Sequence, residues 1–172
     1  MNLIRLLAAG AIAGAAGTAA MDVLWYRRYR REHGQEGFLR WELAADVTDW
    51  EAAPAPGQVG RELEQLVTRR TPPDAWARPT TNVVHWATGV GWGVNLALAK
   101  VALPGSRSLG LALGPVAWIT SYAVLPLMKV YKPIWKYDAR TLGKDLSAHL
   151  VYGVVTAGVY ALLVRRPRLR TR

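Results

Sequence analysis

The chain contains long stretches without a single charged side chain, and these stretches limit what it can fold into. No Asp, Glu, Lys or Arg occurs in three of them, Thr81–Ala99, Ser108–Met128 and Leu146–Val164. A fourth stretch, Leu3–Trp25, carries only Arg5 near its start and Asp22 near its end. Each stretch is close to the ~20 residues that an α-helix needs to cross a ~30 Å hydrocarbon core.

These stretches predict an all-α polytopic membrane protein, a bundle of four transmembrane helices. The predicted spans are residues 3–25, 81–99, 108–128 and 142–164. We treat residues 1–172 as a single membrane domain, with an extramembrane connection at 26–80 and a basic tail at 165–172. A soluble domain with very apolar helices is one alternative. A cleaved signal peptide over Met1–Ala20 is another, although the apolar run continues past it to Trp25.

The charge of the chain is concentrated next to the predicted spans. Lys and Arg number 22 against 12 Asp and Glu, for a net charge of +10, yet the connection Tyr26–Thr80 has nine Arg and nine acidic residues. A nucleic-acid binder gathers its charge on a soluble face or arm and carries a recognition motif, and no such motif occurs here. We therefore expect anionic membrane lipids as partners and no nucleic acid.

Two further features of the composition narrow the class of protein. Eight Trp and seven Tyr against one Phe fit a membrane boundary, where amphipathic rings are enriched. The absence of Cys excludes disulfides and Cys-ligated zinc or iron–sulfur sites. Basic residues that follow the first span favour a cytoplasmic position for the two long connections, whereas the basic tail favours the opposite orientation.

The long connection contains two short segments of helical character. Leu39, Leu43, Val47 and Trp50 share one helical face and predict an amphipathic helix. A second short helix is predicted around Val59–Val67, after a break at Pro54 to Gly57. Such helices either lie in the membrane interface or are solvated helices with an incidental apolar stripe.

Small residues recur every fourth position in each predicted span. These stripes are Gly10, Gly14, Thr18 and Asp22; His85, Gly89, Gly93 and Ala97; Gly110, Gly114, Trp118, Tyr122 and Pro126; and Asp145, His149, Gly153, Ala157 and Ala161. Residues four apart share a helix face, and small side chains let helix backbones approach closely in lipid. The stripes predict that the helices pack closely in a compact bundle. The alternative is that the same faces join two copies of the chain in a homo-oligomer.

Several polar residues of the spans are predicted to meet near one membrane boundary. The first and third spans end on the side where the second and fourth begin. This parity places one set of side chains within roughly 2–10 Å of that boundary: Asp22, Asn82, His85, Tyr122, Asp145 and His149. Because an unpaired ionisable group inside a membrane is costly, we expect these side chains to form one cluster inside the bundle.

Several kinds of chemistry are open to such a cluster. Imidazoles beside carboxylates can relay protons, and nitrogen and oxygen donors can hold a divalent metal. No zinc motif and no nucleophile–base pair is found, so we expect no enzyme, no cofactor and no metal ion. Two functions remain: transport or homeostasis linked to ions or protons, and a structural or lipid-interacting role in which the cluster only holds helices together.

The connection between the third and fourth spans alternates basic and aromatic residues. Lys132, Trp135, Lys136 and Arg140 are candidate contacts for lipid headgroups, since aromatic rings anchor at the interface and cations meet phosphates. The segment is either a general interfacial anchor or a pocket for an anionic lipid or substrate.

The spans also resemble a known family. An Ala/Gly-rich first span, a His opening a Gly-spaced second span, a third span ending in Leu-Pro and a final Ser-Ala-His-Leu-Val-Tyr-Gly helix are similar to the YagU-like small bacterial inner-membrane proteins. The matching residues are His85, Gly89, Gly93, Pro126 and His149. The resemblance covers the spans and hardly touches residues 26–80. It implies a multi-pass protein of the bacterial cytoplasmic membrane and no particular reaction.

Overall fold

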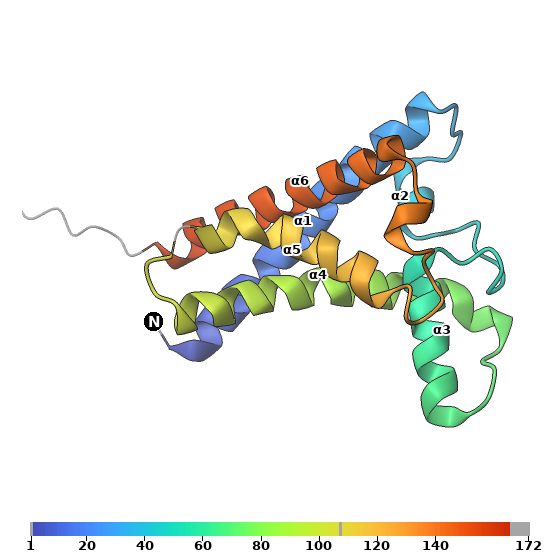
Figure 1. The fold of residues 1–172 in the computed structure, drawn as a ribbon, viewed down its shortest axis with the longest axis horizontal. Coiled ribbons are helices and arrows are strands. Elements are labelled where there is room, and N and C mark those ends of the chain that lie inside the picture. The colour runs from blue at the N-terminus through green and yellow to red at the C-terminus, as the bar shows by residue number, and fades with distance from the viewer. Residues whose placement is uncertain (1, 107, 166–172) are drawn as a thin grey trace, which may run out of the picture.

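The fold was analysed in a computed structural model, which describes residues 2–106 and 108–165. In this described part of the chain, all regular secondary structure is helical and no β-strand occurs (Figure 1). The elements are α1 (Leu3–Arg31), α2 (Phe38–Glu42), α3 (Ala55–Thr68), the 3₁₀ turn η1 (Asp74–Trp76), α4 (Ala77–Ala102), α5 (Ser108–Val124), the 3₁₀ turn η2 (Ile134–Lys136) and α6 (Ala139–Val164). The predicted all-α fold is confirmed. The predicted tail at 165–172 lies outside the described residues except for Arg165.

Two of the helices, α1 and α6, are long and apolar enough to cross a membrane. The apolar helix α5 has 17 residues and so rises roughly 26 Å at 1.5 Å per residue. Helix α4 has 26 residues, but Asn82, His85 and Asn95 make it less apolar. Two candidate spans are therefore found, and the arrangement with four spans stays a prediction.

The predicted third span ends earlier than expected. It was predicted to reach Met128, but α5 ends at Val124, two residues before Pro126. The proline ring disfavours helical geometry at the residue before it, so the helix stops there. A turn follows, with Lys129 at a φ of 58°.

The long helices pack through the predicted small-residue stripes. Helix α1 contacts both α4 and α6, and α5 packs mainly on α6. A Cβ atom added at Gly93 of α4 would lie 2.6 Å from the Cα of Gly14 on α1. On the other side of the bundle, a Cβ added at Gly114 of α5 would lie 2.9 Å from the carbonyl carbon of His149 on α6. The prediction of close packing along the stripes is confirmed, with α1 facing α4 and α5 facing α6.

The first of the two short helices in the connection was predicted wrongly. Helix α2 ends at Glu42, and Val47 and Trp50 lie beyond it in turns. These two side chains are buried with Ala53 and Ala77 in a small core, and the Trp50 indole donates a hydrogen bond to the Pro72 carbonyl at 2.9 Å. Burial against the start of α4 therefore outweighs the helical pattern that Leu39, Leu43, Val47 and Trp50 share.

The second short helix is confirmed as α3, which lies across the end of the bundle, but it begins at Ala55, so the predicted break at Pro54 to Gly57 falls mostly within its first turn. Pro54 occupies its N-cap and Pro56 its first turn, where a missing N–H costs nothing. Helix α3 packs on the start of α4 and extends sideways from it (Figure 1). Three large apolar side chains of its outer half are exposed: Leu63, Leu66 and Val67.

Candidate functional site

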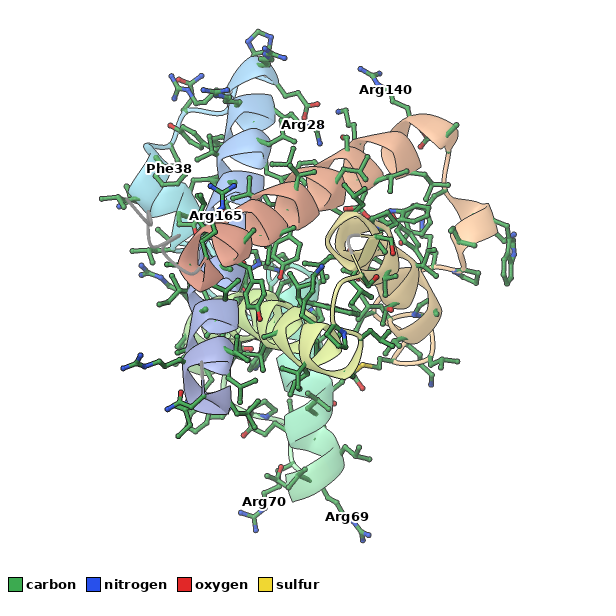
Figure 2. The ribbon with its side chains drawn as sticks, turned by 90° about the vertical axis from the view of Figure 1, so that its left-hand side faces the viewer. Arg28, Phe38, Arg69, Arg70, Arg140 and Arg165 are labelled. Atoms are coloured by element: carbon green, nitrogen blue, oxygen red, sulfur yellow. The ribbon has the colours of Figure 1, made fainter. Side chains whose placement is uncertain are left out.

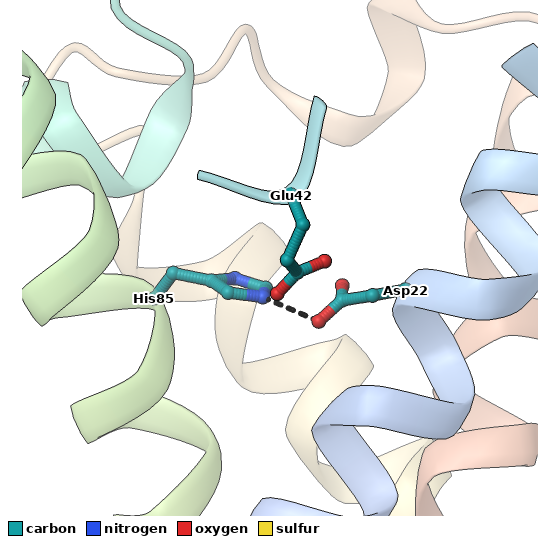
Figure 3. A group of neighbouring side chains, drawn as sticks. All are labelled: Asp22, Glu42 and His85. Atoms are coloured by element: carbon teal, nitrogen blue, oxygen red, sulfur yellow. Dashed lines mark hydrogen bonds and ion pairs between the residues drawn. The ribbon is translucent and has the colours of Figure 1, made fainter. Parts of the chain in front are cut away.

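A contact between a histidine and an aspartate joins α1 to α4 near the end of the bundle that faces the long connection, and it is an ion pair when the imidazole is protonated. The Nε2 atom of His85 lies 2.9 Å from the Oδ2 atom of Asp22 (Figure 3). Only 4% of Asp22 is exposed. Each residue continues the small-residue stripe of its helix, so the close approach of the two backbones brings the two side chains together.

Glu42 of α2 lies beside this pair. One donor atom each of Asp22, Glu42 and His85 falls within 4.8 Å of the others (Figure 3). The Oε1 atom of Glu42 is buried and has no hydrogen-bond partner. The sequence analysis missed this residue, because Glu42 is one of nine acidic residues in the connection and no spacing relates it to either span. We call these three residues the α1–α4 cluster.

Aromatic packing holds α2 against the end of α1. The Tyr26 ring lies 5.2 Å from Phe38 and 5.5 Å from Trp41, measured between ring centroids, and Tyr29 lies 6.0 Å from Trp41. Contacts of this kind add to the stability gained by burying the rings. They fix α2 on α1 and so place Glu42 above Asp22.

A second attachment joins α2 to α4. The carbonyl of Leu43, the residue after Glu42, accepts hydrogen bonds from Arg78 Nε at 3.0 Å and from Asn82 Nδ2 at 3.1 Å. Asn82 was predicted as a member of the polar cluster. It lies on the same helix as His85 and positions the backbone beside Glu42.

The α1–α4 cluster contains two acidic side chains and one imidazole. In the described part of the chain, neither Asp22 nor Glu42 forms an ion pair with Lys or Arg. Burial, and next the neighbouring Asp22 carboxylate, raise the pKa of Glu42 above its usual range. The side chain of His85 is 31% exposed, so part of the cluster reaches the molecular surface.

The other predicted polar residues form a separate group. Asp145 and His149 are one turn apart on α6, with His149 Nδ1 3.5 Å from Asp145 Oδ1 and 3.0 Å from the Asp145 carbonyl oxygen. Tyr122 of α5 packs with Tyr131 and Tyr137, each at a centroid distance of 5.4 Å. Among the described residues, no hydrogen bond or ion pair links this group to Asp22 or His85. The structure thus forms two polar groups, one for each pair of facing stripes.

The predicted lipid contacts lie around η2 and the start of α6. Lys132, Trp135, Lys136 and Arg140 are all exposed, and Trp135 is 77% exposed. Arg140 points outward at one edge of the molecule (Figure 2). These four residues therefore form an accessible basic and aromatic rim.

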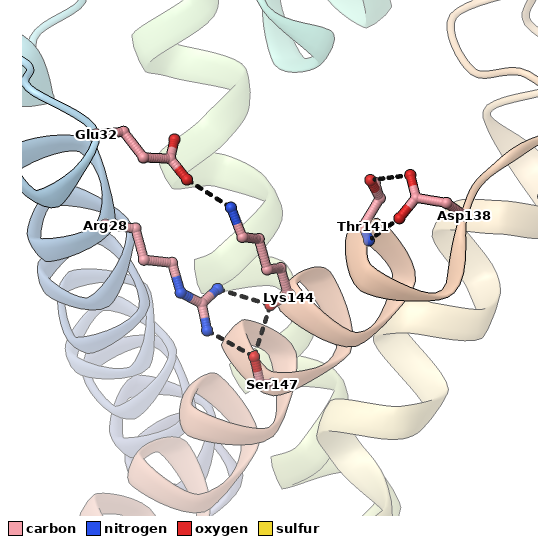
Figure 4. A network of polar contacts seen from close by, with 6 residues as sticks. All are labelled: Arg28, Glu32, Asp138, Thr141, Lys144 and Ser147. Atoms are coloured by element: carbon pink, nitrogen blue, oxygen red, sulfur yellow. Dashed lines mark hydrogen bonds and ion pairs between the residues drawn. The ribbon is translucent and has the colours of Figure 1, made fainter.

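A polar network fixes the ends of α1 and α6 on this side of the molecule. Arg28 donates hydrogen bonds of 2.7 Å to the Lys144 carbonyl and to Ser147 Oγ, and Lys144 Nζ lies 2.5 Å from Glu32 Oε1 (Figure 4). This network holds α6 against the same helix that carries Asp22.

Comparison of the chain with protein-family models, with curated proteins and with solved structures finds no match. The functional argument therefore depends on the geometry. Two carboxylates and one imidazole converge from three elements, which suits the binding of a proton or a cation.

Proposed function

We propose that the chain is a multi-pass protein of the bacterial cytoplasmic membrane that binds protons or cations at the α1–α4 cluster as part of ion-linked transport or homeostasis. The observation that carries this proposal is the ion pair between buried Asp22 and His85, with the unpartnered Glu42 oxygen beside it. Ionisable groups buried inside a membrane are costly and therefore rare. Where they do occur, they commonly mark a pathway for ions or protons.

The proposal includes four spans, and the exposed surfaces of the long helices support it. Each of these helices exposes large apolar side chains, among them Ile12 of α1, Val83 of α4, Leu111 of α5 and Val154 of α6. Their exposed fractions are 57%, 66%, 73% and 60%. Lipid around all four helices would cover this apolar surface, whereas a water-soluble monomer rarely exposes so much of it.

Flux through the purified protein in liposomes tests the transport function. A pH gradient is imposed across the membrane and the internal pH is followed with a trapped dye. We expect the protein to dissipate the gradient faster than empty liposomes do, and His85→Ala to remove this activity. His149→Ala is the matched control, since it deletes an imidazole from the other polar group. Wild-type protein that behaves like empty liposomes contradicts transport.

A second candidate function, interaction with anionic lipid without transport, is favoured by α3. This helix exposes Leu63, Leu66 and Val67. It ends at Thr68, and Arg69 and Arg70, which follow it directly, project from the molecule (Figure 2). An amphipathic helix that lies across the ends of spans, with basic residues at its tip, fits the headgroup region of a membrane. In this case Asp22 and His85 serve only to hold α1 against α4.

A further inference from the structure

We propose that Asp22, Glu42 and His85 bind a divalent transition-metal ion of the Zn²⁺ or Mn²⁺ class. This inference depends on the proposed function, because it names the cation that the α1–α4 cluster would handle. It assigns a separate role to each side chain: Asp22 and Glu42 each supply a carboxylate oxygen, and His85 supplies Nε2.

The positions of the donor atoms are close to those of a metal site. Ligands about 2.1 Å from a metal in tetrahedral geometry lie roughly 3.4 Å from one another. In the cluster, His85 Nε2 and Asp22 Oδ2 are 2.9 Å apart, and all three donors fall within 4.8 Å of one another. Binding an ion therefore requires His85 Nε2 and Asp22 Oδ2 to move roughly 0.5 Å apart, with the third donor already inside the 4.8 Å limit.

Glu42 is the residue that distinguishes a metal-binding site from a simple pair of Asp22 and His85. Asp22 and His85 already satisfy each other, so Glu42 adds a second carboxylate to a place that has no Lys or Arg partner among the described residues. Its Oε1 atom is buried without a hydrogen bond, which costs free energy as long as nothing binds to it. A divalent cation would neutralise both carboxylates and give that oxygen a ligand.

The types of donor favour a transition metal over Mg²⁺ or Ca²⁺. The two hard cations prefer oxygen ligands, whereas an imidazole nitrogen suits Zn²⁺, Mn²⁺ and related ions. Three protein ligands leave at least one coordination position for water. The His85 side chain is 31% exposed, so the cluster is open to the molecular surface on one side.

The second polar group provides an internal comparison. Asp145 and His149 also place a carboxylate beside an imidazole, at 3.5 Å, but both lie on one helix. In the described part of the chain, no other carboxylate or imidazole completes a three-residue group with them. Their substitution should therefore leave metal binding unchanged.

Metal binding by the full-length protein in detergent tests the inference. The protein is treated with EDTA, desalted, incubated with Zn²⁺, Mn²⁺ or Mg²⁺ and desalted again, and bound metal is measured by mass spectrometry. We expect about one Zn²⁺ or Mn²⁺ per chain and little Mg²⁺. Glu42→Gln and His85→Ala should lower the bound metal at least tenfold, while Asp145→Asn and His149→Ala should keep the wild-type amount.

Controls separate loss of metal from loss of the fold. Circular dichroism and gel filtration report on the fold of each variant, and Glu42→Gln is the key variant because Glu42 lies outside the long helices. Asp22→Asn is a further variant that should lose metal. If it does not fold, the metal content of Glu42→Gln still tests the inference. Equal metal in wild type and folded Glu42→Gln, or no metal in wild type, overturns the inference.

The same preparations distinguish this inference from the proposed function. Metal binding without any flux supports the metal site and contradicts transport. Flux that His85→Ala removes, in a protein that binds no metal, supports proton handling and overturns the metal site. Zn²⁺ or Mn²⁺ that binds and also enters liposomes, in a manner that depends on Glu42, supports both.

Discussion

At the scale of single residues, the contact between α1 and α4 depends on glycines, which have no Cβ atom. Gly10 and Gly14 of α1 lie against Gly89 and Gly93 of α4 so closely that a Cβ at any of the four would collide with the facing helix. Backbone proximity of this kind carries the Asp22 and His85 side chains to within 2.9 Å. The glycines therefore set the geometry of the α1–α4 cluster although they carry no chemistry.

Adding one methyl group at this contact should separate the two helices. We expect Gly93→Ala to lower the free energy of unfolding in detergent by about 1–3 kcal/mol, because the new atom meets the backbone of α1. Gly91→Ala is the control, since nothing lies within 4 Å of a Cβ there. Unfolding by a denaturing detergent, followed by circular dichroism, measures both. Similar stabilities for the two variants would show that the helices are not in close contact.

The hydrogen bonds of Asp138 at the start of α6 predict that the stability of the fold depends on pH. Its side chain accepts hydrogen bonds from Thr141 Oγ1 and from the Thr141 amide, and these bonds lower the pKa of Asp138 (Figure 4). Since the folded pKa lies below the unfolded value of about 3.9, the carboxylate stabilises the fold at higher pH. That contribution is lost as the pH falls through the lowered folded pKa.

The corresponding measurement is the melting temperature of wild type and Asp138→Ala between pH 3 and pH 7. We expect the variant to melt lower at neutral pH and the difference to shrink below about pH 4. A constant difference over the whole range would mean that Asp138 does not act through its charge.

The residue scale also shows how far the sequence can predict a site. Asp22 and His85 could be predicted as neighbours because both continue small-residue stripes. Asp145 and His149 were expected in the same cluster, but the stripe of α6 faces α5, so they form a group of their own. Glu42 could not be predicted, because its position depends on how the rings of Tyr26, Phe38 and Trp41 pack.

At the scale of elements, the long helices were predictable and the short ones only in part. Long apolar stretches favour long helices, and α1, α4 and α6 cover such stretches while α5 covers most of one. The connection is different, because its residues divide between helix and turns according to what they can be buried against. Val47 and Trp50 leave the helical pattern to pack on Ala77, and a single sequence does not reveal that partner.

Helix α3 should lie in the interface with its apolar face in the lipid. Because the chain has no Cys, single cysteines can carry a fluorescent probe. We expect a probe at Val67→Cys, 82% exposed, to be quenched at least twofold more by spin-labelled lipids than one at Gln65→Cys on the opposite face. The measurement uses liposomes that contain anionic lipid. Equal quenching at the two positions would contradict an interfacial helix.

At the scale of the whole molecule, the number of spans determines which loops share a side. With four spans, the connection that contains Gln35 and the loop that contains Ser106 lie on opposite sides of the membrane. With only α1 and α6 as spans, the two lie on the same side. We expect Ser106→Cys, but not Gln35→Cys, to react with an impermeant thiol reagent in intact bacterial cells, since the basic residues after α1 favour a cytoplasmic connection.

Permeabilised cells provide the control for this experiment, because both cysteines should then react. Opposite reactivity, with Gln35→Cys labelled from outside, would keep four spans and reverse the orientation. Equal labelling of both positions in intact cells would contradict the arrangement with four spans.

The pairing of Asp22 with His85 also has a consequence for how the protein is made. Asp22 precedes His85 by 63 residues along the chain. At ~5–20 residues per second, a ribosome needs about 3–13 s to reach the second residue after the first. Over that interval Asp22 has been made but its imidazole partner has not, so the contact between α1 and α4 can form only after the first part of α4 has been synthesised.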